Sequence, residues 1–345
     1  MLSLFLFILL LTYLINYATD NIFYSIILII NPCLILIFNY IHISEIYYSM
    51  FLVIFLIFLY KKYLFTAMLF LFLLSLIRDN SILVCFATIV ASLFEREYKW
   101  AVASFVVLIL GCTTIFIVGL FGNPNVHGMN DILYMVYKIP YNFLKNVAGL
   151  KIWTNTLVDS AIKLGYALPA PPAIKVTVPP WLPLGGIREI GFYPWDPWKS
   201  FQTLAFLLTT FSVAPLVLIY DLIKVGKPRR GRFDLWLLVA MIYGLATFVL
   251  STSVGSTVYR LVWFAWPAFW LVAPTLLEHD YQVTHRHMLQ LLACHVALTW
   301  LLWPLALWYG EENKIMLIFA ASVLIYWFSF KILKQSLNDR SIIAH

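Results

Sequence analysis

The sequence predicts an all-α, polytopic helical membrane protein with about eleven transmembrane helices and one long external loop that bears amphipathic helices. The first observation is composition: 63% of the residues are hydrophobic, 11% are charged and the mean hydropathy is +0.89, whereas soluble domains carry about 25% charged residues. The second is that apolar runs of about 17–25 residues recur, the length of a helix that crosses a bilayer core of about 30 Å. No alternation of the kind found in membrane β-barrels dominates the sequence.

The apolar runs divide the chain into three parts. We expect N-terminal transmembrane helices in residues 1–121, an external loop in 122–200 and C-terminal transmembrane helices in 201–345. The expected spans lie near residues 1–17, 22–40, 46–60, 64–77, 81–94, 100–121, 201–223, 234–251, 261–277, 288–308 and 315–333.

The orientation follows from Lys and Arg, because connectors rich in these residues stay on the cytoplasmic side. The basic connectors all fall on one side of the expected spans, and their residues are Lys61, Lys62, Arg96, Lys99, Lys224, Lys227, Arg229, Arg230, Arg232, Lys331, Lys334 and Arg340. The N-terminus is therefore expected outside. Since no basic residue precedes the apolar run 1–17, we interpret that run as a retained helix rather than a signal peptide.

The net charge of +7 comes largely from these connectors, so it does not indicate a nucleic-acid partner. The four cysteines lie in apolar runs without CxxC spacing, which is typical of packing residues rather than of a disulfide or metal framework. His279, His285 and His287 share a short polar connector, where a solvated loop is the preferred interpretation over a metal site.

The long loop changes character along its length. Residues 131–168 mix spaced apolar positions with lysines, which predicts amphipathic helices on the membrane surface. The prolines of residues 169–183 then favour extended or turning chain. Several aromatic residues follow, Trp195 among them. They fit either an interfacial aromatic belt or a loop that contacts a sugar or lipid.

Charged residues on the expected outer side are candidates for function, because charge at a membrane edge is costly. In the first group, His42 precedes Glu45, whose carboxylate could coordinate a divalent cation or act as a base. The alternative is a helix start, with Ser44 as N-cap and Glu45 favoured by the helix dipole.

The second group is Arg78-Asp79-Asn80, a tight break between two apolar runs. Arg suits bidentate phosphate binding, and Asp79 could orient it or hold a metal. A simple charged turn is the alternative. Tyr259 and Arg260 form a third group that could clamp a phosphate or reach lipid headgroups.

Arg188, in the long loop, is a fourth basic candidate on the same side. Several basic residues that face one membrane surface suit an anionic, lipid-linked substrate such as a polyprenyl phosphate carrying a sugar.

The order of features in residues 31–94 is Asn31-Pro32, an apolar run, Ser44-Glu45, an apolar run, Lys61-Lys62, an apolar run and Arg78-Asp79-Asn80. This order resembles the central membrane region of C-fold (GT-C) glycosyltransferases, which include protein O-mannosyltransferases and the aminoarabinose transferases of lipid A. The resemblance implies that Glu45 helps to bind metal or donor phosphate. It also implies that Arg78-Asp79 takes the slot of a basic–acidic pair, and that residues 122–200 cover the active cavity.

The chain departs from this family pattern at its start. The family's first helix and first external loop, which hold the catalytic acidic residue, have no match here, because the run 1–17 is expected to lead inward and Asp20 falls on the cytoplasmic side. A truncated reading frame, a partner chain that supplies the segment and a non-catalytic relative are the three explanations, so enzymatic activity stays open.

The sequence-based hypothesis is a glycosyltransferase-like, multi-pass protein of the cytoplasmic (inner) membrane that uses a polyprenyl-phosphate-linked sugar on the non-cytoplasmic face. The alternatives are a non-catalytic subunit or scaffold of a membrane complex, a lipid-linked glycan polymerase and a transporter. The assigned roles are Glu45 and Asp79 as catalytic acids; Arg78, Arg188 and Arg260 as donor-phosphate ligands; His42, Trp195 and Tyr259 as substrate contacts; and Glu45 as ligand of a divalent cation, Mg or Mn.

Overall fold

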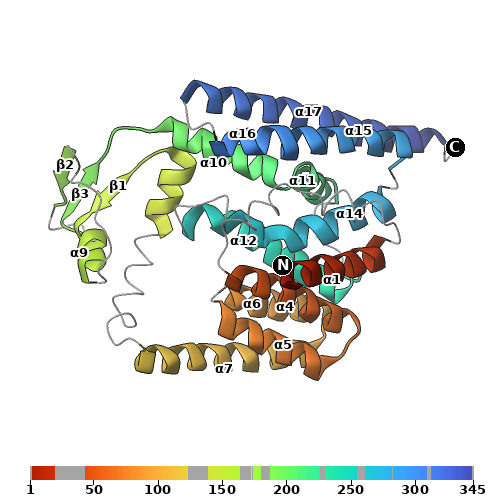
Figure 1. Cartoon of the computed structure of the whole chain (residues 1–345), viewed down its shortest axis with the longest axis horizontal. Coiled ribbons are helices and arrows are strands. Elements are labelled where there is room, and N and C mark those ends of the chain that lie inside the picture. The colour runs from red at the N-terminus through yellow and green to blue at the C-terminus, as the bar shows by residue number, and fades with distance from the viewer. Residues whose placement is uncertain are drawn as a thin grey trace.

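The computed structural model of the chain is mostly helical, and its helices lie side by side in layers (Figure 1). It describes residues 2–19, 43–78, 80–122, 139–163, 172, 174–179, 187–225, 230–254, 261–281, 283–308 and 312–343. Every expected span that lies in this part of the chain is helical. The expected span 22–40 falls outside it.

The first group of helices follows the predicted apolar runs closely. Its members are α1 (Leu2–Thr19), α4 (Ile43–Tyr60), α5 (Leu64–Ile77), α6 (Ser81–Glu95) and α7 (Tyr98–Gly122). Short basic turns join α4 to α5 and α6 to α7. Lys62 and Arg96 both adopt positive φ there, and the N–H groups of Arg96 and Glu97 bond back to Leu93 and Ser92. This closes α6 in the manner of a Schellman motif.

The segment between α7 and α10 (Pro197–Thr210) contains a small sheet that the sequence did not predict. The described elements of this segment are η1 (Leu144–Ala148), β1 (Ile152–Thr154), α9 (Asn155–Lys163), β2 (Ile174–Thr177) and β3 (Glu189–Phe192). The three strands form an antiparallel sheet in the order β1-β3-β2. Extended chain was expected from the prolines. A Cβ on Gly191 would lie 2.1 Å from the Cγ of Pro172. Because residue 191 is a glycine, Pro172 can pack over the central strand.

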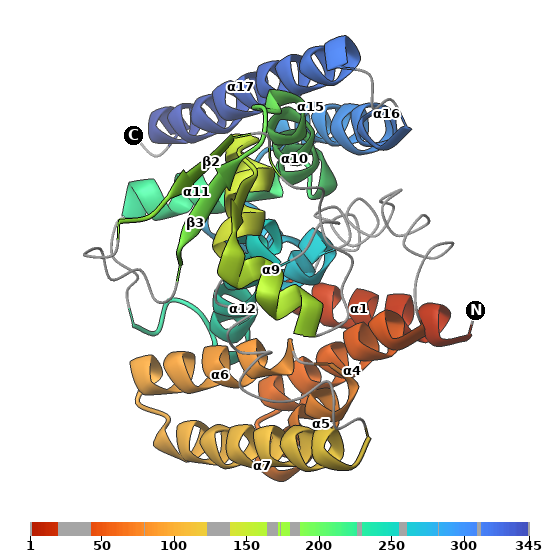
Figure 2. The same ribbon diagram turned by 90° about the vertical axis from the view of Figure 1, so that its left-hand side faces the viewer.

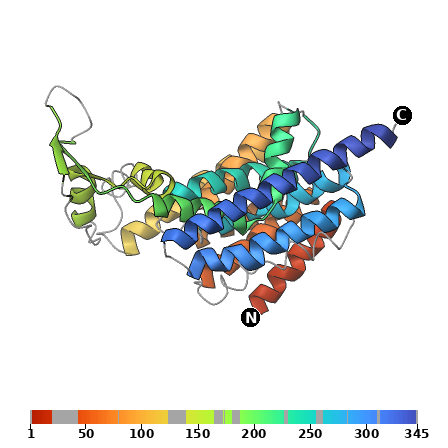
Figure 3. The same cartoon turned by 90° about the horizontal axis from the view of Figure 1, so that it is seen from above.

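The sheet projects from one end of the helices (Figures 2 and 3). Figure 2 faces this end, with α17 (Glu312–Ile343) above the strands and α5 and α7 below them. We name it the sheet end. The last residues of α7 and the first residues of α10 point toward it (Figure 1).

The C-terminal group contains several irregular helical turns. It comprises α10 (Pro197–Thr210), α11 (Ala214–Val225), α12 (Leu235–Val254), η2 (Trp263–Ala265), η3 (Ala268–Val272), α14 (Ala273–Thr275), η4 (Leu276–Asp280), α15 (His285–Val296), η5 (Ala297–Leu302), α16 (Trp303–Trp308) and α17 (Glu312–Ile343). The run from η2 to η4 is nearly all buried, and Trp266 and Trp270 are its largest fully buried side chains. Gly244 of α12 lets this run pack closely against α12, because a Cβ on Gly244 would lie 2.4 Å from the Cβ of Ala268.

Within the residues that the structure describes, three helices are long and apolar enough to cross a membrane: Leu235–Ser253, Arg286–Ala306 and Lys314–Ser336. A fourth is obtained if α10 and α11 count as one span, although these two helices meet at 85°. This is fewer than the eleven expected. The apolar stretches described in full within α1, α4, α5, α6 and α7 are 10–17 residues long, and 15 residues at a rise of about 1.5 Å extend about 23 Å, less than a core of about 30 Å. As a whole helix, α7 has 25 residues.

The break between α10 and α11 is closed by side chains from other helices. Ser212 has a φ of 55°, and the carbonyls of Leu208 and Ser212 accept hydrogen bonds from the Tyr326 hydroxyl of α17. Trp303 Nε1 donates to the Thr210 hydroxyl at 3.2 Å. Backbone groups freed from a buried helix need such partners, because water does not reach them.

Candidate functional site

Glu45 and Arg78, which the sequence singled out in two separate connectors, form an ion pair. Arg78 Nη1 donates to Glu45 Oε1 at 2.7 Å. The two residues meet because α4 and α5 are joined by a tight turn and pack against each other, so the start of α4 lies beside the end of α5. An acid in a first helical turn and a base after a last turn both complement the helix dipole. We call these two residues the outer pair, after the side on which the sequence predicts them.

The outer pair is buried unequally. The Glu45 side chain is 1% exposed, whereas that of Arg78 is 24% exposed. The guanidinium also lies over the ring of Phe264, 4.6 Å from its centroid. A guanidinium has five N–H donors, more than this contact with Glu45 uses. Arg78 is therefore held in a fixed position with donors left for a second anion.

Two tyrosines lie below the outer pair. Tyr48, one turn after Glu45, is fully buried, and its hydroxyl lies 3.2 Å from that of Tyr243 in α12. Its ring also contacts Phe264 edge-on at 5.5 Å, and the charge of Arg78 acts on both phenols. Sequence reasoning missed these residues, since a tyrosine inside an apolar run has the same pattern as a packing residue.

Trp195 and Arg188, two other predicted residues, belong to the sheet end. Trp195 is 67% exposed, and its Nε1 donates to the carbonyl of Ala148 at 2.9 Å. Arg188 is exposed just before β3, where its backbone N–H bonds to Asn155 Oδ1 at 2.8 Å. Neither residue contributes a described contact to the outer pair.

The remaining predicted site residues lie outside the described residues: His42, Asp79, Tyr259 and Arg260. The part of the chain that the structure describes contains no group of three His, Cys, Asp or Glu side chains that could hold a metal ion. Glu45, the predicted metal ligand, bonds to Arg78, and its role toward a cation stays a prediction.

The other end of the helices carries a second set of charges. Arg232 donates two hydrogen bonds to Asp221, at 2.7 and 2.5 Å, and a third to Asp280 at 2.6 Å. Tyr281 donates to the same Asp221 carboxylate at 2.7 Å. We call this group the Arg232 clamp. The hydrogen bonds between Arg232 and Asp221 raise the pKa of the guanidinium, which therefore stays charged.

The sequence contains one sign of the Arg232 clamp, because Asp221 is an acid inside the expected apolar span 201–223.

The histidine connector also differs from its prediction. His287 was expected to be solvated, but it is buried, and its Nδ1 lies 2.8 Å from the Thr284 hydroxyl at the start of α15. His279 contacts the Ala18 carbonyl at 3.1 Å.

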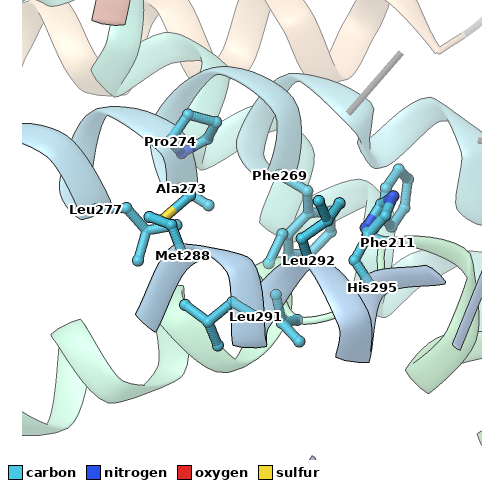
Figure 4. A pocket seen from close by; sticks show the side chains of 11 residues that line it. Phe211, Phe269, Ala273, Pro274, Leu277, Met288, Leu291, Leu292 and His295 are labelled. Atoms are coloured by element: carbon cyan, nitrogen blue, oxygen red, sulfur yellow. The ribbon is translucent and has the colours of Figure 1, made fainter. Parts of the chain in front are cut away.

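A small cavity lies beside the break between α10 and α11 (Figure 4). Its walls are almost entirely apolar, with Phe211, Phe269 and Met288 among them and His295 on one side. Its volume of about 40 Å³ accommodates about three waters. A sugar or a phosphate does not fit, so the outer pair is the stronger candidate for a binding site.

No family model matches the chain, and the searches of curated proteins and of solved structures found no similar protein.

Proposed function

We propose that the chain is a multi-pass protein of the cytoplasmic (inner) membrane, with about eleven spans and with residues 122–200 on the non-cytoplasmic side. Two sets of contacts support this orientation. The outer pair joins connectors expected outside, and the Arg232 clamp joins connectors expected inside. The shorter helices fit such a protein if neighbouring helices and locally thinned lipid shield their ends.

We further propose that it is a glycosyltransferase-like protein that binds a polyprenyl-phosphate-linked sugar at its outer end. The observation that carries this proposal is Arg78, held by a buried carboxylate and an aromatic ring with part of its surface exposed. A guanidinium fixed in this way favours a phosphate, because bidentate N–H···O bonds match that anion.

The chemistry of such a transfer needs few protein groups. A carboxylate takes the proton of the acceptor hydroxyl, whose oxygen then forms a bond to the sugar carbon while the bond from that carbon to the phosphate oxygen breaks. Arg78 stabilises the charge that develops on the leaving polyprenyl phosphate. Asp79 is the proposed base. Glu45 is then a positioning residue for Arg78, and no step is assigned to a divalent cation.

A non-catalytic membrane subunit is the second candidate. The burial of Glu45 favours it, because a carboxylate that is 1% exposed and paired with Arg78 cannot take a proton from an acceptor at the surface. Of the two predicted catalytic acids, Asp79 alone is then left for that step. The two candidates share the binding site and differ in turnover.

Binding to a polyprenyl phosphate tests the proposal with full-length protein in nanodiscs of phosphatidylcholine. Arg78→Ala should weaken binding at least about tenfold, the loss of about 1.4 kcal/mol or more that a charge-assisted hydrogen bond supplies. Arg286→Ala is the matched control, because this exposed arginine lies in the first turn of α15 near the opposite end. Unchanged binding by Arg78→Ala in a protein that melts like the wild type would contradict the proposal.

Sugar transfer separates the enzyme from the subunit. Asp79→Asn should stop the release of polyprenyl phosphate from the lipid-linked sugar while leaving binding intact. If Asp79→Asn combined with Glu45→Gln releases it at the wild-type rate, neither carboxylate is the base. If the wild-type protein itself releases none, the subunit interpretation is preferred.

A further inference from the structure

Three lysines gather where the sheet end joins the helices. Lys145 lies in η1, Lys151 precedes β1 and Lys199 lies in the first turn of α10. All three are half-buried. The charges of Lys145 and Lys151 both act on Lys199, so the three ammonium groups share one small region. We call it the lysine cluster.

The backbone is built to hold this cluster together. Asp196 N–H bonds to the Gly149 carbonyl at 3.0 Å, and Tyr193 N–H bonds to the Lys151 carbonyl at 3.2 Å. Gly149 has a φ of 67°, and a Cβ there would lie 2.1 Å from the Asp196 carbonyl oxygen. This glycine therefore allows the chain around η1 to approach the start of α10 closely.

The negative charge in the cluster is smaller than the positive charge. Asp196 bonds to Lys151 Nζ at 3.3 Å and also accepts the Lys199 backbone N–H at 3.4 Å. The charge of Asp196 also acts on both Lys145 and Lys199. Three ammonium groups thus share one carboxylate.

Such an arrangement is costly without an anion. Partial burial lowers the pKa of Lys145, and the charge of Lys151 lowers it further, while Asp196 opposes the shift. The charged form of Lys145 is therefore less favourable here than in water. A bound anion reverses this effect, and the N-terminal end of α10 adds the partial positive charge of its dipole.

We propose that Lys145, Lys151 and Lys199 bind the phosphate of a lipid headgroup or lipid-linked sugar at the outer surface. Trp195, directly before Asp196, is exposed beside them and suits the headgroup region, where tryptophan is favoured. This site deepens the proposed function. It rests on that function in one respect, because the proposed function names a polyprenyl phosphate as one source of the bound phosphate.

The lysine cluster and the outer pair are connected through α12. Asn146, the neighbour of Lys145, donates to the Thr252 carbonyl at 2.8 Å, and Tyr243 lies below the outer pair. Nine residues at about 1.5 Å each separate Tyr243 from Thr252 by about 13 Å along the helix. The two sites therefore lie at different depths on the same end of the helices.

Protection from an amine-reactive reagent tests the site in the full-length protein in phosphatidylcholine nanodiscs. Polyprenyl phosphate, phosphatidylglycerol and inorganic phosphate are the three probes, and peptide mass spectrometry gives the labelling of each lysine. A saturating probe should slow the labelling of Lys145 and Lys199 severalfold. Lys175, exposed in β2 and lying over Trp153, should be unaffected and serves as the control. Protection by phosphatidylglycerol alone identifies a membrane lipid as the source, and protection by inorganic phosphate alone identifies a free phosphate.

The matched variants are Lys199→Gln, Lys145→Gln and Lys175→Gln, each of which removes one positive charge. The first two should weaken binding of the protecting probe about tenfold, and Lys175→Gln should leave it within about twofold. Lys199→Arg keeps the charge and should retain binding. Binding should also weaken as pH rises through the lowered pKa of Lys145, because the ammonium form is lost.

Three results would overturn the proposal: no protection by any probe, equal protection of Lys175, or wild-type binding by both Lys145→Gln and Lys199→Gln. The outcome for Arg78 is separate. If Lys199→Gln loses polyprenyl phosphate and Arg78→Ala keeps it, the lysine site stands and the role proposed for Arg78 fails.

Discussion

Arg232 illustrates how one side chain can hold separate segments of the chain together. Asp221 belongs to α11, Arg232 to the turn before α12 and Asp280 to the end of η4, and the Asp221 and Arg232 side chains are 6% and 18% exposed. A buried ion pair adds little net stability relative to apolar packing. Removing one partner is costly, because the other charge stays buried alone.

Arg232→Ala should therefore destabilise the protein by about 3 kcal/mol, since Asp221 loses its bidentate partner. The midpoint of thermal unfolding in detergent, followed by circular dichroism, measures the change. Arg230→Ala is the control: Arg230 is 50% exposed and 3.9 Å from Glu95, and such pairs contribute under about 1 kcal/mol. Equal midpoints for the two variants would contradict the role of the Arg232 clamp.

At the same scale, the sequence identified part of the candidate site. Glu45 and Arg78 were identified because charge beside an apolar run is conspicuous. Lys145, Lys151 and Lys199 were not, because lysines in a long polar segment are ordinary. Their significance comes from the approach of η1 to α10, which no local pattern encodes.

Among the elements, the break between α10 and α11 departs most from the predicted pattern. Residues 201–223 read as one apolar span, yet the chain turns by 85° near Ser212. Tyr326 of α17 makes the turn possible by donating to the carbonyls of Leu208 and Ser212. The segment is apolar and helical as expected, but it forms two helices rather than one continuous span.

Tyr326→Phe should destabilise the protein by about 1–3 kcal/mol, because buried carbonyls lose their hydrogen-bond donor while the ring is kept. Tyr98→Phe makes the same chemical change at a residue that is 60% exposed and should have little effect. Unfolding midpoints in detergent compare them. A Tyr326→Phe protein as stable as Tyr98→Phe would show that the hydroxyl does not support the break.

At the scale of the whole molecule, the charges sort between two ends. The outer pair and the lysine cluster lie toward the sheet end, and the Arg232 clamp lies at the other. The positive-inside bias assigned the connectors to the same two groups from their composition alone.

Thiol labelling of intact cells tests this sidedness. In a variant without Cys33, Cys85, Cys112 and Cys294, a single cysteine at Lys175 should react with a membrane-impermeant maleimide in intact cells. One at Arg286 should react only after permeabilisation. The opposite pattern would reverse the proposed orientation, and reaction of both in intact cells would exclude it.

The sequence by itself determined where most helices of the described part form, because hydropathy acts on each segment directly; the side on which each connector lies stays a prediction. The expected span 64–77, for example, coincides with α5. Tertiary structure alone decided that Glu45 pairs with Arg78, that Asp196 lies among three lysines and that α10 ends at a sharp bend. These features depend on which segments pack together, and packing joins residues too far apart in the chain for any local pattern to relate them.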